Sequence, residues 1–469
     1  MKKRILIPRT PLQRIMTLAA LLLVCVPGYV RSQHLIHGTI NGYNQRTIVL
    51  SAIRGDQQLP VDSVKTNREG YFRLETKNWY QPGMYFLQTD EDQHIKIIYN
   101  NTDIQLVSDN TTEDVQVEFV GSDENKLWYE YSVLKAETKA KKDLINPILQ
   151  QYPQDETFYQ QAVEAYNQLQ QQLISKADYI YLKHSETLAA RFIRADVPPM
   201  INLQLPYDEQ LRQLKNHFFD KTDFADTLLL NSDVLTTKMI DFLALHQQPQ
   251  MDMSALQYVF IEALDVIMKN AAVEKKTYLF ALEYFIEGFA RMGFTGITDY
   301  LSNLPHLNNE CMDMQTLMEV ERIAGPHRRV ITGSAAPEIV LNDIHGHPFS
   351  LEQTKEKVKL LVFWSVNCPH CLLAIPEIKK LAEKWPQIQI ISFVLSTDRN
   401  KLDEIIAREQ LSWIHLSDGL GWNSTVAQEY MVYGTPTLFL IDEQNNILSK
   451  PASVAEAEAV IQLHFNKPE

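Results

Sequence analysis

The chain contains no glycine between Gly121 and Gly288, although glycines occur at short intervals on both sides of this stretch. Glycine interrupts helices and marks turns, so its absence removes the commonest local break in a helical pattern. The same stretch is rich in Leu, Gln, Ala, Glu and Lys, which favour helices. We therefore predict an α-helical domain over residues 122–325, between two regions of different character.

Helix signals divide this middle region. Ser122 or Asp123 is a candidate N-cap for a helix through "ENKLWYEYSVLKAETKAKK". Segments 255–270 and 276–292 carry apolar residues at helical spacing, and their Met and aromatic stripe is interpreted as packed core rather than as a cofactor site. Further helices are expected to be separated by prolines, namely Pro147, Pro153, Pro198, Pro199, Pro206 and Pro249.

Before the helical region, residues 33–121 follow a period of two with glycine and proline breaks. The segments that read as strands are "HLIHGTI", "TIVLSAI", "GYFRLET", "GMYFLQT", "HIKIIYN", "DIQLVSD" and "VQVEFVG". Many short strands at regular spacing are typical of an all-β, sandwich-like domain.

After the helical region, Gly325, Pro326, Gly333 and Pro337 suggest a linker into a domain over residues 326–469. There, continuous apolar strands such as "KVKLLVFW" and "QIQIISFVLS" alternate with helical segments, and "TLFLIDEQNNILS" reads as a hairpin. Buried strands that alternate with helices predict an α/β layer. The expected fold is thus multidomain: all-β, then all-α, then α/β.

Residues 1–32 have the features of a secretory signal peptide: a basic start, a short apolar run and the sequence Val30-Arg31-Ser32 before Gln33. The alternative is an uncleaved anchor, which would be the chain's one link to a membrane. Cleavage would change the formal charge from −14 to −20 and leave Cys311, Cys368 and Cys371, too few for a disulfide framework. So acidic a chain is not expected to bind nucleic acid.

The stretch "FWSVNCPHC", from Phe363 to Cys371, holds two cysteines where a predicted strand ends and a helix begins. Free N–H groups at a helix N-terminus favour the thiolate of Cys368, which is the form that attacks disulfides. Cys371, on the first turn, is close enough to form an intramolecular disulfide with it. Pro369 and His370 lie between them, and His370 is a candidate to tune the thiolate.

The region from about residue 333 to 466 resembles the thioredoxin superfamily. Trp364 and Pro376 stand at the family's spacing from the cysteines, and "YGTPTLFLID" resembles its cis-proline loop. The resemblance implies that Pro436 is cis and faces the cysteines and that Thr435 and Pro436 bind an extended substrate. Trp364 is expected to pack under the site and is counted among the substrate-binding residues.

The lead-in "GSAAPEIVLNDIHGHPFSLEQ" looks like the exported TlpA/ResA branch, here with β-rich and helical N-terminal extensions. The dipeptide Pro369-His370 matches that of DsbA, a strong oxidant. The architecture nevertheless favours the TlpA/ResA reductase branch.

Two positions depart from the family pattern. Val362 stands where thioredoxin has a buried carboxylate, and Ala374 stands where TlpA-type proteins often have Glu. Both of those groups could accept the proton of Cys371. The remaining candidates are water, His370 or a carboxylate such as Asp398.

Other interpretations of the cysteine pair are a structural disulfide and a zinc site completed by His345 and His347. A peroxidase of the peroxiredoxin kind would need Pro and Thr where Leu361 and Ser365 stand. A binding protein on a thioredoxin scaffold is the alternative outside enzymes. Cys311 is interpreted as an unpaired thiol.

The prediction is an exported thiol–disulfide oxidoreductase of a Gram-negative periplasm or cell envelope, acting as a reductase. The alternative direction is a disulfide-forming or isomerising oxidant. Cys368 attacks, Cys371 resolves, and the two form the redox-active disulfide. Protein thiols or disulfides and a partner dithiol are the expected reactants, with no metal or organic cofactor.

Overall fold

The structure, a computed structural model, describes residues 34–89, 94–109, 116–304, 313–354 and 356–465. The predicted signal segment 1–32 and Cys311 lie outside the described residues. The chain divides into two units. The first comprises residues up to Ile53 and Gln58–Glu130, and the second comprises Arg54–Gln57 and the residues from Tyr131 onward.

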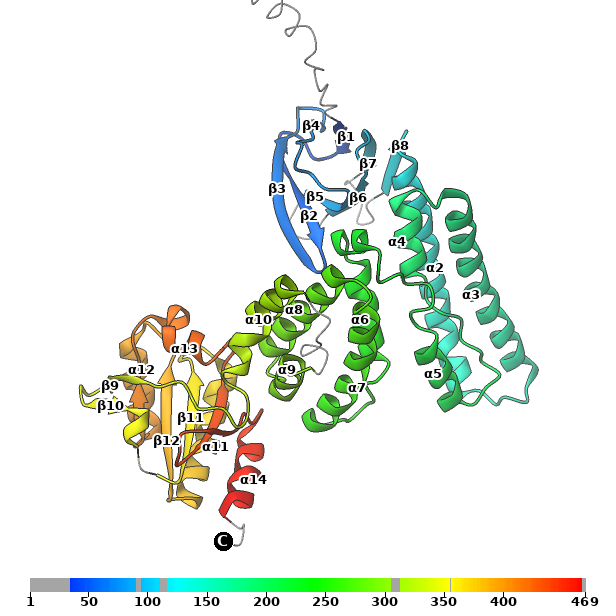
Figure 1. Cartoon of the computed structure of the whole chain (residues 1–469). Coiled ribbons are helices and arrows are strands. Elements are labelled where there is room, and N and C mark those ends of the chain that lie inside the picture. Colours follow the sequence, from blue (N-terminus) through cyan, green and yellow to red (C-terminus); the bar gives the residue numbers. More distant parts are fainter. Residues whose placement is uncertain (1–33, 90–93, 110–115, 305–312, 355, 466–469) are drawn as a thin grey trace, which may run out of the picture. The chain divides into compact units, whose positions relative to one another are not determined.

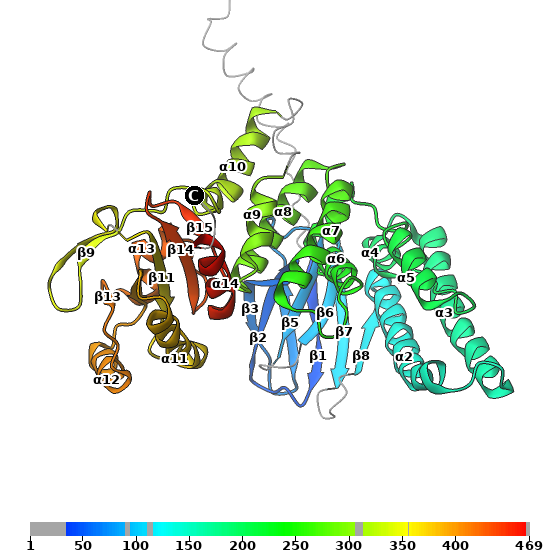
Figure 2. The same ribbon diagram turned by 90° about the horizontal axis from the view of Figure 1, so that it is seen from below.

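The first unit consists of two four-stranded sheets that share one core (Figures 1 and 2). One sheet has the order β4-β1-β7-β8 and the other β3-β2-β5-β6. Its strands are β1 (Leu35–Asn41), β2 (Thr47–Arg54), β3 (Gln57–Lys65), β4 (Tyr71–Glu75), β5 (Gly83–Gln88), β6 (His94–Tyr99), β7 (Ile104–Asp109) and β8 (Gln116–Val120).

The core of this unit follows from alternation along the strands. Ile36 and Ile40 of β1 point inward, as do Ile48 and Leu50 of β2, and all four belong to one buried cluster. Successive side chains of a strand point to opposite faces, so each strand contributes every second residue. β1 pairs parallel with β7, so the sheets are not purely antiparallel.

Strand β3 has no counterpart among the predicted strands. It lies at the edge of its sheet, and most of its residues are exposed, Pro60 among them. Proline cannot donate to a sheet ladder and is tolerated at an edge, so this strand lacks the apolar alternation that reveals the others.

The middle of the chain is helical. The helices are α2 (Asp123–Gln151), α3 (Thr157–His184), α4 (Leu188–Asp196), α5 (Tyr207–Asn216), α6 (Val234–Ala244), α7 (Met253–Ala271), α8 (Lys275–Arg291), α9 (Thr295–Ser302) and α10 (Met314–Arg328). Aspartate and threonine cap several of them; the Asp252 side chain accepts the N–H of Ala255, for example. Among the described residues, no helix combines the length and apolarity needed to cross a membrane.

Two expected breaks are absent. Pro147 lies inside α2 rather than after it, and α10 continues through Gly325 and Pro326 to Arg328. The expected linker at residues 325–326 is therefore helical, because a proline removes one hydrogen bond but does not always end a helix. The domain boundaries at 121/122 and 325/326 remain predictions.

The last part of the chain is a five-stranded sheet of order β13-β12-β11-β14-β15. β11 pairs parallel with β12 and antiparallel with β14. Its elements, together with the preceding β9-β10 hairpin, are β9 (Val340–Asn342), β10 (Pro348–Ser350), β11 (Val358–Trp364), α11 (Pro369–Lys384), β12 (Ile388–Val394), α12 (Arg399–Glu409), β13 (Ile414–Leu416), α13 (Thr425–Glu429), β14 (Thr437–Asp442), β15 (Ile447–Ser449) and α14 (Val454–Phe465).

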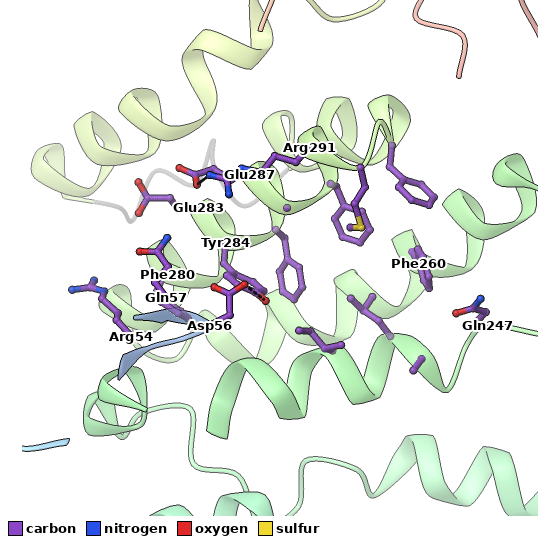
Figure 3. A pocket seen from close by; sticks show the side chains of 18 residues that line it. Arg54, Asp56, Gln57, Gln247, Phe260, Phe280, Glu283, Tyr284, Glu287 and Arg291 are labelled. Carbon is purple, nitrogen blue, oxygen red and sulfur yellow. Dashed lines mark hydrogen bonds and ion pairs between the residues drawn. The ribbon is translucent and has the colours of Figure 1, made fainter. Parts of the chain in front are cut away.

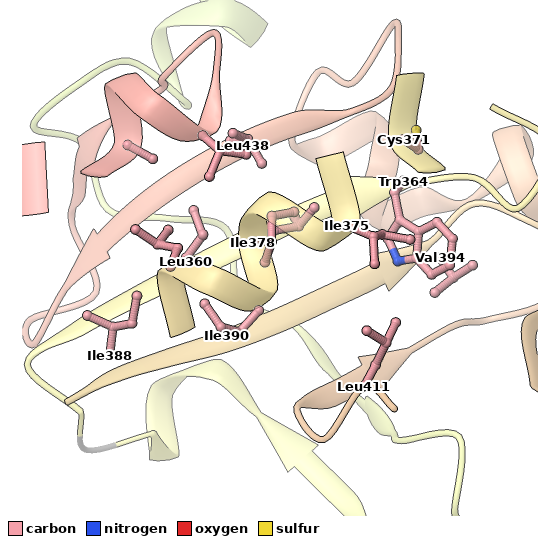
Figure 4. Close-up of a cluster of buried hydrophobic side chains, with 14 of the residues drawn as sticks. Leu360, Trp364, Cys371, Ile375, Ile378, Ile388, Ile390, Val394, Leu411 and Leu438 are labelled. Carbon is pink, nitrogen blue, oxygen red and sulfur yellow. The ribbon is translucent and has the colours of Figure 1, made fainter. Parts of the chain in front are cut away.

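The central strand β11 is buried at every residue. Leu360 and Val362 face a cluster that includes α11 residues (Figure 4), whereas Leu361 and Phe363 face a second cluster on the opposite side. A strand covered on both faces reads as a continuous apolar run, which explains why "KVKLLVFW" was recognisable. The predicted hairpin of β14 and β15 is confirmed.

Candidate active site: a cysteine pair at a helix start

Cys368 stands at the junction of the central strand and helix α11. β11 ends at Trp364, a short turn follows, and Cys368 is the N-cap of α11 with extended backbone angles. Pro369 occupies the first helical position, where its missing N–H costs no hydrogen bond and its fixed φ suits a helix. The sequence Cys-Pro therefore starts the helix with a sulfur as its capping atom.

The sulfur of Cys368 lies among hydrogen-bond donors. The backbone N–H of Cys371 donates to Cys368 Sγ at 3.3 Å. Partial burial raises the pKa of the Cys368 thiol, but hydrogen bonds from Cys371, Thr435 and the His370 backbone outweigh it, so the net pKa is lowered. Cys368 is also partly exposed, so its thiolate is both favoured and accessible.

Cys371 has the opposite environment. It is 1% exposed and belongs, with Trp364 and Ile375, to the buried cluster of Figure 4. Burial raises its pKa, and the neighbouring sulfur of Cys368 raises it further. One thiol of the pair thus favours the charged form at the surface while the other stays protonated in the core.

The loop before β14 adjoins the pair. The Thr435–Pro436 peptide bond is cis, and the Sγ–H of Cys368 donates to the Thr435 carbonyl oxygen at 3.2 Å. Pro436 lines a small cavity together with Cys371. The Thr437 hydroxyl fixes the loop by donating to the Gly434 carbonyl at 2.8 Å. The structure therefore brings Thr435 and Pro436 next to both cysteines.

The remaining predicted residues differ in exposure. Pro369 and His370 are exposed at the start of α11, beside the accessible sulfur. Trp364 is 3% exposed and packs in the core. Its position is that of a residue that packs under the site, and the substrate-binding role of Trp364 remains a prediction.

Polar side chains near Cys371 come from strands whose contribution the sequence did not reveal. The cavity beside Cys371 is lined by Val362, Trp364, Ala374, Ile375, Ile378, Ser392, Trp413 and Pro436. Ser392 of β12 hydrogen bonds with His415 of β13. Their signal in the sequence was a polar residue within each apolar strand, but only the strand register places them together.

Asp398, a candidate proton acceptor, has another role. It is exposed and caps helix α12, where its Oδ1 accepts the N–H of Lys401 at 3.0 Å. His345 and His347 lie in the exposed turn between β9 and β10, where His347 pairs with Asp343. Across the described ranges, no group of three or more His, Cys, Asp or Glu side chains is arranged to hold a metal ion.

A much larger cavity, of about 780 Å³, lies among the helices (Figure 3). Tyr284 of α8 points toward Asp56, in the turn between β2 and β3, and its hydroxyl donates to Asp56 at 3.4 Å. The predicted aromatic stripe of residues 255–292 is thus only partly packed core. The aromatic residues that line this cavity are Phe260, Phe280, Tyr284, Phe285, Phe289 and Phe294.

Two family models match the chain. The Redoxin model matches residues 331–460. A domain of unknown function, DUF4369, matches residues 34–128, which covers most of the first unit. The C-terminal match contains both cysteines and the cis-proline loop.

Two curated relatives match about a quarter of the chain. A thioredoxin-like protein of Haemophilus influenzae is 27% identical over 118 residues, which cover 25% of this chain and 68% of that protein. The thiol-disulfide oxidoreductase ResA of Geobacillus kaustophilus is 27% identical over 120 residues, 25% of this chain and 67% of ResA.

Two solved structures of similar description match different shares of the chain. A thiol-disulfide oxidoreductase from Bacteroides fragilis is 24% identical, with a TM-score of 0.26 over 28% of this chain and 99% of that one. A thioredoxin-like protein from Bacteroides caccae is 17% identical, with a TM-score of 0.35 over 57% of this chain and 97% of that one.

The region matched by the Redoxin model thus carries the cysteine pair at a helix start, and the two named relatives match about a quarter of this chain over two thirds of their own length. Residues 331–460 are accordingly a thioredoxin-like region, similar to TlpA/ResA-like, thioredoxin-like oxidoreductases.

Proposed function

We propose that this protein exchanges two electrons with other proteins through Cys368 and Cys371, and that it acts as a disulfide reductase. The observation that carries the proposal is the contrast between the two thiols. Cys368 is accessible and its pKa is lowered, whereas Cys371 is buried and its pKa is raised. An attacking thiol needs to be accessible and to have a low pKa, whereas a thiol that reacts only in the second step can be buried and have a high pKa.

The reaction has two displacements. The Cys368 thiolate attacks a substrate disulfide R–S–S–R′, forms the mixed disulfide Cys368–S–S–R and releases R′–S⁻. Cys371 then attacks the Cys368 sulfur, forms the Cys368–Cys371 disulfide and releases R–S⁻, and the thiol proton of Cys371 is released with it. The substrate gains two electrons, the pair loses two, and a partner dithiol restores the pair.

The neighbouring residues take supporting roles in this proposal. Thr435 and Pro436, beside the sulfur, bind the backbone of an extended substrate. His370 and the free N–H groups at the start of α11 stabilise the Cys368 thiolate. Pro369 sets the start of that helix, and Trp364 fills the space beneath.

The reduction potential of the pair tests the direction. The mature chain would be equilibrated with glutathione buffers and its thiols counted by mass after alkylation. A value near that of thioredoxin, about −270 mV, supports a reductase. A value near that of DsbA, about −120 mV, means that the Pro369-His370 dipeptide dominates and that the protein forms or rearranges disulfides. The absence of a reversible couple would leave only a binding scaffold.

Trapping tests whether the pair acts on proteins. In a Cys371→Ala variant the mixed disulfide cannot be resolved, so covalent adducts should accumulate at Cys368. A Cys368→Ala variant is the matched control, because it keeps the buried thiol and loses the accessible one. Equal adduct levels in the two variants contradict the assigned order of attack.

The site of action is proposed to be the periplasm or cell envelope of a Gram-negative bacterium. The support is the basic and apolar character of residues 1–32. N-terminal sequencing of protein recovered from the periplasm should begin at Gln33. A start at Met1 in a membrane fraction favours the uncleaved anchor.

A further inference from the structure

Cys371 must lose its proton in the second displacement, yet none of the described residues that line the cavity beside it carries a carboxylate. Val362 and Ala374, at the positions that hold acids in related proteins, both line the cavity beside it. Burying a thiolate without any polar partner is costly. Some other polar group must therefore serve Cys371 if the proposed function is right.

A polar pair occupies the neighbouring strands at the same level. Val362 of β11 is in register with Ser392 of β12, and Ser392 is in register with His415 of β13. The Ser392 Oγ and His415 Nδ1 lie 2.7 Å apart. Ser392 is 1% exposed and His415 is 3% exposed, so this hydrogen bond is inside the protein.

Ser392 faces the same small cavity as Cys371. The cavity has a volume of about 10 Å³ and a mostly apolar lining, and Cys371, Ser392 and Trp413 are the lining residues whose side chains carry a thiol, a hydroxyl or an N–H group. The Trp413 Nε1 atom is buried and has no hydrogen-bond partner among the described residues. A space of about this size holds one water when two to four polar groups surround it.

We propose that this cavity is a site for a single water molecule, held by Ser392 and Trp413, and that this water is the polar partner of the Cys371 sulfur. The inference rests on the proposed function, because it concerns the step in which Cys371 resolves the mixed disulfide. His415 is a positioning residue in this arrangement, since it acts on the water through Ser392.

The donors and acceptors around the water are complementary. The indole N–H of Trp413 can only donate, so it donates to the water oxygen. The Ser392 hydroxyl can donate or accept a hydrogen bond. Its hydrogen bond with His415 Nδ1 determines whether it donates to the water or accepts from it. The water keeps a hydrogen to donate to a sulfur that becomes negative, and hydrogen bonds to a charged acceptor are the stronger kind.

The step then balances without a carboxylate. In the mixed disulfide, Cys371 begins as a thiol and Cys368 is bonded to the substrate sulfur R. The Cys371 proton passes to the solvent and the substrate sulfur leaves as a thiolate, which takes up a proton there if it is basic enough, while the bound water stabilises the transient Cys371 thiolate and is itself unchanged. His415 remains neutral throughout, because burial lowers its pKa to about 4.

The titratable groups that affect Cys371 and His415 can be named element by element. On α11 the titratable neighbour of Cys371 is Cys368, which is uncharged in the mixed disulfide. β11 contributes Val362 and Trp364, and the cis-proline loop contributes Thr435 and Pro436. On the far side of His415 are Asp343 and His345, which affect its pKa in opposite directions.

The inference is tested by measuring how fast the reduced protein releases the two aryl thiolates of an aromatic disulfide, one after the other. Reduced mature protein with Cys311→Ser, so that one pair of thiols remains, would be mixed with an aromatic disulfide in a stopped-flow instrument. The first thiolate reports attack by Cys368 and the second reports resolution by Cys371. Rates would be measured from pH 5 to pH 10.

Ser392→Ala and Trp413→Phe should each slow the second release about tenfold at neutral pH, which is the loss of one hydrogen bond to a charged sulfur. The second release should recover at higher pH. The first release should stay within about twofold of the parent rate, because Cys368 does not face the water.

Matched variants separate this role from packing. Ser392→Thr keeps the hydroxyl and should retain most of the second-step rate. Trp385→Phe removes another buried indole N–H, outside the cavity, and should change neither step. His415→Asn retains a polar atom where Nδ1 lies and should be closer to the parent than His415→Leu.

The outcomes are distinct. A second release with the parent rate and pH profile in both Ser392→Ala and Trp413→Phe overturns the water site while leaving the proposed function intact. Release of one thiolate or none by the parent protein overturns the proposed function itself.

Discussion

The backbone N–H of Cys371 donates a hydrogen bond to the sulfur of Cys368 at 3.3 Å, so the second residue of the pair stabilises the thiolate of the first. Because the donor is backbone, Cys371→Ala retains it. We expect iodoacetamide to modify Cys368 in that variant at least about tenfold faster at pH 6 than it modifies Cys371 in Cys368→Ala. Mass spectrometry of time points measures both rates, and similar rates would contradict the assignment.

A carboxylate placed beside Cys371 should replace the polar partner described above. Ala374 is half-buried and lines the cavity, so Ala374→Glu brings an acid to it. We expect the second thiolate release to become about tenfold faster at neutral pH, since a positioned base assists proton loss. Leu373→Glu is the control, because Leu373 is 73% exposed and its substitution adds the same charge to solvent. An equal gain in both variants would exclude a local effect.

Lys450 and Asp299 form a buried ion pair between the end of the sheet region and helix α9. Burial raises the pKa of Asp299, and Lys450 opposes that rise. Lys450→Met leaves the carboxylate without its cation, and we expect the free energy of unfolding to fall by about 3–5 kcal/mol. Urea denaturation measures the change. The double variant with Asp299→Leu should recover most of the loss, and no recovery would mean that lost packing is responsible.

Two buried histidines make stability depend on pH. Burial lowers the pKa of His415, and likewise that of His327, from 6.5 to about 4. As pH falls below 6.5, each of these histidines binds a proton in the unfolded chain but stays neutral in the folded chain. The free energy of unfolding therefore decreases until about pH 4. Each histidine should account for about 3 kcal/mol of this decrease.

His415→Asn should reduce the slope of stability against pH between 6.5 and 4. Denaturant unfolding at several pH values measures the slope in the parent and the variant. An unchanged slope in the variant would show that His415 takes up its proton over the same pH range in the folded and the unfolded chain.

The sequence was sufficient to place Cys368 between an apolar strand and a helix, and to identify the strands that are buried on both faces. A cysteine pair between an apolar strand and a helix has few structural interpretations. The strand β11 is recognisable because its seven consecutive residues are all buried and mostly apolar. Proline was less informative, because Pro147 and Pro326 lie within helices that neighbouring hydrogen bonds maintain.

The polar pair behind Cys371 could not be predicted, because it depends on strand register. Ser392 and His415 are 23 residues apart, and nothing local to either one shows that β12 and β13 align them. The depth at which Trp364 is buried likewise depends on packing, which the spacing of the motif alone does not express.

The unequal exposure of the two sulfurs limits the order in which partners can react. Cys371 has almost no surface, so every partner, whether it gives or takes electrons, must meet the protein at Cys368. A donor and an acceptor cannot occupy one sulfur together, so they alternate. The pair should therefore follow ping-pong kinetics, in which each partner leaves before the next arrives and both compete for the same surface.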